Sequence, residues 1–95
     1  MAVSISRQLV DAARRHLVED VPLGDMNLGM ADRNRIERVK YVRFLSEKEP
    51  GLDVFAKLRR LAAGRYENTI EEWREAKKDM MLFEQLLEGN GKTEK

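Results

Sequence analysis

Residues 69–88 read TIEEWREAKKDMMLFEQLLE, and no other stretch of the chain predicts its own structure as clearly. Apolar residues recur in this stretch at alternating steps of three and four, which is the spacing of one face of an α-helix. The residues on that face are Trp73, Ala76, Met80, Phe83 and Leu87. The pattern predicts a long amphipathic helix that buries this seam, either in the core of the protein or against a partner.

The two ends of this helix carry signals of their own. Thr69 and Glu72 have the spacing of a capping box, in which each side chain accepts a hydrogen bond from the backbone N–H of the other residue. Gly89 follows the last regular position and is predicted to end the helix in a left-handed conformation. We therefore expect the helix over residues 69–88 and a flexible polar tail over residues 89–95.

Three further helices are predicted upstream, over residues 4–18, 32–48 and 54–63. Ser4 and Asp53 stand at the starts of the first and third helices and are residue types that cap helix N-termini. Gly64 occupies the position of a left-handed C-terminal glycine, and Pro50-Gly51 breaks the chain before the third helix.

The helix over residues 32–48 changes character along its length. Its first half is basic and is predicted to project toward solvent. Its second half is apolar over most of the helix circumference, because it contains Val39, Tyr41, Val42, Phe44 and Leu45. Helices that are apolar nearly all round are buried, so we expect this second half at the centre of the fold.

Residues 19–31 connect the first two helices and carry five large apolar side chains. A structureless loop of this length is uncommon in a compact domain. We expect either a short helical turn around residues 25–28 or a loop that packs over the core. The remaining alternative is an apolar surface that is offered to a partner.

These patterns together predict an all-α protein, a compact, bundle-like domain of four main helices over residues 1–88 with a long amphipathic C-terminal helix. A length of 95 residues fits one domain, and 42% hydrophobic residues with a net charge of +1 exclude an intrinsically disordered chain. The sequence shows neither a secretory leader nor an apolar run of membrane-spanning length, so we expect a cytoplasmic protein.

The sequence lacks the residues that catalysis needs. Cysteine is absent and His16 is the single histidine, so the chain has no thiol nucleophile and no zinc–thiolate site. His16 lies on the apolar face of its helix and is predicted to be a core or interface residue with one ring nitrogen hydrogen-bonded. We therefore predict a non-enzymatic protein with no cofactor and no metal.

The last helix favours a function in protein contact. Its apolar residues cover more of the helix than a single seam needs, which favours a partner that is another protein or a second copy of the chain. We expect a small regulatory or adaptor protein. The predicted anchors are Trp73, Met80, Phe83 and Leu87, with a charged rim of Glu71, Glu75 and Asp79.

A nucleic-acid interface is the alternative. Residues 33–65 carry ten basic and four acidic side chains, whereas residues 66–88 carry three basic and seven acidic ones. The cations either form one phosphate-binding surface or pair with the acidic side chains of the last helix in the same molecule. The candidate phosphate contacts are Arg33, Arg35, Arg38, Lys40, Arg59 and Arg60.

Overall fold

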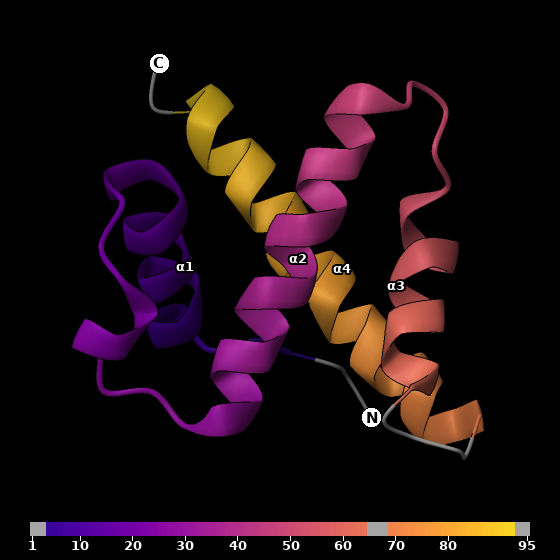
Figure 1. The fold of residues 1–95 in the computed structure, drawn as a ribbon, viewed down its shortest axis with the longest axis horizontal. Helices are drawn as coiled ribbons and strands as arrows, with labels where there is room; N and C mark the ends of the chain where they lie inside the picture. The colour runs from indigo at the N-terminus through magenta and orange to yellow at the C-terminus, as the bar shows by residue number, and fades with distance from the viewer. Residues whose placement is uncertain (1–3, 65–68, 93–95) are drawn as a thin grey trace.

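Four α-helices and one short 3₁₀ turn make up the computed structural model, which describes residues 4–64 and 69–92 (Figure 1). The elements are α1 (Arg7–Glu19), η1 (Leu23–Asp25), α2 (Met30–Lys48), α3 (Val54–Ala63) and α4 (Thr69–Lys92). The described residues contain no strand, so the predicted all-α class is confirmed. In that part of the chain, no helix combines the length and the apolar content that crossing a bilayer requires.

Helix α2 lies at the centre of the molecule and contacts α1, α3 and α4. Figure 1 shows α2 crossing in front of α4, with α1 on one side of the pair and α3 on the other. The larger part of the core lies among α1, η1, α2 and α4, where Ile36 and Leu82 are fully buried. A smaller cluster of Val42, Leu58 and Ala76 joins α2, α3 and α4.

The N-terminal caps of α1 and α3 use the residue types that the sequence indicates. The Asp53 carboxylate accepts a hydrogen bond of 3.1 Å from the backbone N–H of Ala56, as predicted. At α1 the predicted cap, Ser4, is wrong by two positions. The Ser6 hydroxyl accepts the bond from the N–H of Leu9 at 3.1 Å, because only Ser6 lies three residues before that amide.

The connection between α1 and α2 packs onto the core, as one of the alternatives predicted. Leu23 and Met26 are buried in the larger cluster, and Val21 and Leu28 pack against it. The helical turn within the connection spans Leu23–Asp25, slightly earlier than predicted. A chain of this length buries a relatively small fraction of its surface, and the apolar side chains of this segment enlarge its core.

Both expectations about the environment of α2 need correction. The first half of the helix does not simply project into solvent, because Arg35 and Ile36 are buried there. The second half is not buried all round, because Tyr41 is 47% exposed and Phe44 is 53% exposed. The burial divides along the two faces of the helix, since α4 packs on the inner face, whereas the two aromatic rings on the opposite face are only partly covered.

Glycine proved a poor marker of helix ends in this chain. Gly64 caps α3 in a right-handed conformation, with φ of −65°, so the predicted left-handed geometry is wrong. Helix α4 runs through Gly89 to Lys92 and does not end at Glu88. A glycine inside a helix costs only about 1 kcal/mol relative to alanine, which a continuing helix tolerates.

The predicted capping box of α4 is not the arrangement observed. Thr69 is already helical, and the Glu72 carboxylate accepts a hydrogen bond of 3.0 Å from Arg59 Nη2. The residues directly before Thr69, and residues 93–95 of the predicted tail, lie outside the described part of the chain.

Candidate functional site

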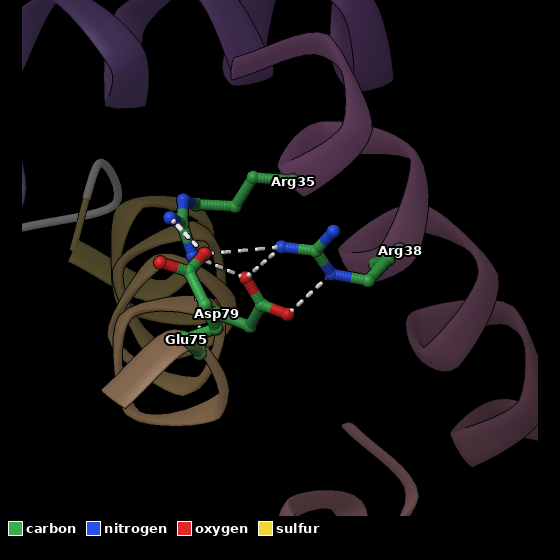
Figure 2. A network of polar contacts seen from close by, with 4 residues as sticks. All are labelled: Arg35, Arg38, Glu75 and Asp79. Atoms are coloured by element: carbon green, nitrogen blue, oxygen red, sulfur yellow. Dashed lines mark hydrogen bonds and ion pairs between the residues drawn. The ribbon is translucent and has the colours of Figure 1, made fainter. Parts of the chain in front are cut away.

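Basic side chains of α2 and acidic side chains of α4 meet in a buried network (Figure 2). Arg35 Nη1 donates to Asp79 Oδ1 at 2.5 Å and to the backbone carbonyl of Glu75 at 3.1 Å. Arg35 Nη2 donates to Glu75 Oε1 at 2.6 Å. Figure 2 shows the guanidinium groups of Arg35 and Arg38 extending from α2 toward the two carboxylates on α4.

Arg38 completes the network with a two-point contact on Asp79. Its Nε donates to Asp79 Oδ2 at 2.7 Å and its Nη2 to Asp79 Oδ1 at 3.0 Å. Asp79 is fully buried, and the side chain of Arg35 is 8% exposed. Buried charges are tolerated when they are paired and hydrogen-bonded, and here two cations balance two carboxylates. The arrangement fixes α2 against α4, and its four charges sum to zero.

A third contact of the same kind joins α3 to α4, between Arg59 and Glu72 at 3.0 Å. Internal pairing, one of the two alternatives that the sequence left open, therefore holds for Arg35, Arg38 and Arg59. The other three predicted phosphate contacts lie apart from this network. Arg33 is half-buried, and Lys40 and Arg60 are exposed.

The predicted seam of α4 divides into a buried middle and exposed ends. Phe83 belongs to the larger core cluster, and Met80 packs against both clusters. Trp73 is 42% exposed and Leu87 is 47% exposed. Only the ends of the seam are therefore accessible to a partner.

The predicted charged rim is also divided. Glu71 is exposed and Glu75 is half-buried, whereas Asp79 is fully buried between the two arginines of α2. The assignment of Asp79 to a rim is wrong, because on a helix it lies on the same face as Glu75 and Leu82, which point toward α2.

Among the described residues, the largest accessible aromatic surface lies on α2, where the sequence indicated burial. Glu37, Tyr41, Phe44 and Lys48 are all exposed, and we call these four residues the outer face of α2. Their spacing of four, three and four residues places them on one side of the helix. This spacing is visible in the sequence. Because both sides of α2 carry apolar residues, however, the sequence does not indicate which side is covered.

Two hollows flank the outer face of α2. The larger, of about 610 Å³, is lined by His16, Pro22, Leu23, Glu37, Lys40, Tyr41 and Phe44. The smaller, of about 300 Å³, is lined by Asn34, Glu37, Arg38, Tyr41 and Leu61. Glu37 and Tyr41 belong to both linings, so Tyr41 forms a ridge between the hollows.

His16 forms one edge of the larger hollow and bridges two elements. Its Nδ1 lies 2.8 Å from the carbonyl oxygen of Val21, and its Nε2 lies 3.3 Å from Nζ of Lys40. The carbonyl can only accept and the ammonium can only donate, so the contacts fit a neutral imidazole with its proton on Nδ1. The side chain is half-buried with Nδ1 hydrogen-bonded, as predicted.

The described residues contain no group of three or more His, Asp or Glu side chains placed to hold a metal ion. Comparison of the chain with protein-family models, with curated proteins and with solved structures finds no match.

Proposed function

We propose that the chain is a non-enzymatic regulatory or adaptor protein of the cytoplasm that acts by helix-mediated contact with another polypeptide. The outer face of α2 is the proposed contact surface. The observation that carries the proposal is the half-exposed pair Tyr41 and Phe44 on the central helix, where Tyr41 separates two hollows and Phe44 lines the larger one. Aromatic side chains with adjacent hollows are the features that anchor protein interfaces.

The support behind this surface favours binding. The inner side of α2 is fixed by fully buried Ile36, Val39 and Val42 and by the charge network with α4. A rigid helix presents its outer side chains without the entropy cost of ordering a loop. Binding at this surface therefore loses less conformational entropy than binding at a mobile surface would.

The lining of the larger hollow indicates the kind of polypeptide that fits. Its lining combines apolar groups from Pro22, Tyr41 and Phe44 with the opposite charges of Glu37 and Lys40. An amphipathic helix with mixed charges beside its apolar stripe matches this arrangement. Such a helix can insert large side chains on either side of the Tyr41 ridge.

Helix α4 offers a less continuous surface. Its exposed apolar side chains lie at its two ends, Ile70 and Trp73 at one and Leu87 at the other, which is fourteen residues or about 21 Å beyond Trp73, and the seam between them is packed in the core. Nζ of Lys77 lies 5.4 Å from the centre of the Trp73 ring and covers part of it.

Site-specific photo-crosslinking in the cells that express the protein tests the proposal. The photoreactive residue p-benzoylphenylalanine is placed at Phe44 in one variant and at Trp73 in a matched control, because both rings are about half exposed. We expect an adduct with a polypeptide from position 44 and none from position 73. Adducts from position 73 alone would assign the contact to α4 and contradict the proposal.

A binding assay with nucleic acid separates the alternative function. Purified protein is titrated into a short DNA duplex and into single-stranded RNA at low and at moderate salt. We expect no salt-dependent complex, because Arg35, Arg38 and Arg59 are engaged by carboxylates. A complex that weakens steeply with salt would favour a phosphate-binding surface.

A further inference from the structure

We infer that the polypeptide that covers the outer face of α2 is a second copy of this chain, paired with its α2 antiparallel to the first. This inference rests on the proposed function and names its partner. It starts from the order of the four side chains of the outer face along the helix, which is acid, aromatic, aromatic and base: Glu37, Tyr41, Phe44 and Lys48.

This order is complementary to itself when one of two helices is reversed. A two-fold axis that passes midway between residues 42 and 43 sets Tyr41 opposite the partner's Phe44. The same axis sets Glu37 opposite the partner's Lys48. Because the axis repeats each contact, the pair gains two aromatic contacts and two ion pairs from four residues on each side.

The charge order also selects the direction of pairing. Parallel helices in register would set Glu37 against the partner's Glu37 and Lys48 against the partner's Lys48. Like charges placed directly opposite each other disfavour association, whereas the antiparallel arrangement meets only opposite charges at these positions. The outer face therefore specifies one orientation.

Contacts within the single chain are compatible with this pairing. Nζ of Lys48 lies 4.9 Å from the centre of the Phe44 ring, so the ammonium is already held beside the aromatic surface. An acidic side chain that arrives at Phe44 from a partner meets this cation there. The hollows on either side of Tyr41 leave room for the partner's aromatic rings.

The mass of the purified chain as a function of concentration gives the first test. Sedimentation equilibrium should show the mass rising from 11.1 kDa toward twice that value with increasing concentration. Phe44→Glu should stay at the single-chain mass over the same range. Trp73→Glu, which changes a ring of similar exposure on α4, should dimerise as the wild type does.

Charge reversal gives the sharper test, because it predicts a rescue. Glu37→Lys alone and Lys48→Glu alone each place like charges together twice, and each should weaken self-association about tenfold. An equimolar mixture of the two variants restores both ion pairs in the mixed dimer. We expect that mixture to associate about as strongly as the wild type.

Three results would overturn the inference: a wild-type chain that keeps the single-chain mass at all concentrations, a Phe44→Glu variant that still dimerises, or a mixture of charge variants without rescue. Photo-crosslinking at position 44 then tells the two proposals apart. An adduct with a different protein would refute self-pairing and leave the contact function standing. The absence of any polypeptide adduct at position 44 would refute both.

Discussion

The two faces of α2 show how one helix uses similar residues for opposite purposes. The inner face combines the apolar residues Ile36 and Val39 with Arg35, and all three are buried. The outer face combines Tyr41 and Phe44 with charges and remains exposed. Composition does not separate the two faces, since each carries large apolar side chains with charged neighbours.

What separates the faces is the presence of carboxylates on a helix distant in the sequence. Asp79 and Glu75 of α4 approach the inner face and satisfy the guanidinium groups there. Burial of an arginine is costly without such partners, so the face that meets α4 became the core. The outer face remains exposed in the single chain, and we have proposed that a second α2 covers it.

Removal of the Asp79 carboxylate should have the largest effect on the inner face. Asp79→Ala leaves the two cations Arg35 and Arg38 with Glu75 as a single carboxylate in the network, and this imbalance of buried charge is expected to lower the free energy of unfolding by about 3–5 kcal/mol. Urea unfolding followed by circular dichroism measures the change. Glu84→Ala, an exposed acid on the same helix, serves as the control and should change stability by less than about 0.5 kcal/mol.

A direct comparison of apolar residues on the two faces should show the next largest effect. Ile36→Ala removes a fully buried side chain and should lower the free energy of unfolding by about 2–4 kcal/mol. Phe44→Ala, measured at concentrations where the chain is a monomer, should cost less than about 1 kcal/mol. Similar losses for the two variants would mean that the outer face is part of the core.

Two basic residues of α2 allow the same comparison for charge. Arg38→Met removes a two-point contact with Asp79 and should cost about 1.5–3 kcal/mol, because hydrogen bonds between charged groups are among the stronger ones. Lys40→Met, two residues along the helix on an exposed position, should be nearly neutral. Thermal unfolding at several salt concentrations measures both changes. If the two variants lowered the melting temperature equally, the contacts of Arg38 on the inner face would contribute no more to stability than an exposed lysine.

The smallest effect is expected at the more exposed contact between α3 and α4. The side chain of Arg59 is 41% exposed, so solvent screens its ion pair with Glu72. Arg59→Met should therefore cost less than about 1 kcal/mol, with the exposed neighbour Arg60→Met as the reference variant. If Arg59→Met lowered the free energy of unfolding as much as Arg38→Met does, the stabilising charge network would include α3 as well.

Much of the fold was predictable, because it depends on neighbours in the sequence. The four helices follow from apolar spacing, and the Asp53 cap follows from its position three residues before an unpaired backbone N–H. The burial of Leu23 and Met26 follows from the apolar content of their loop. Glycine failed as a marker at Gly64 and Gly89, because it permits a left-handed end without requiring one.

The candidate site was predicted less well, because it depends on residues far apart in the chain. The acids and bases that pair were identified, but the sequence left open whether they meet one another or a nucleic acid. Asp79 was assigned to a rim although it is fully buried, and the exposed ring of Phe44 was assigned to the core. Both errors concern which side of a helix is covered, and helical spacing carries no information on that point.

The sequence by itself determined which residues share a helix face, since a period of 3.6 residues follows from local backbone geometry. Only the tertiary structure decided which face of α2 is buried, since that choice requires Arg35 and Asp79, 44 positions apart, to meet. A buried charge is stable only beside its partner, and the position of a partner on another helix is a property of the folded chain.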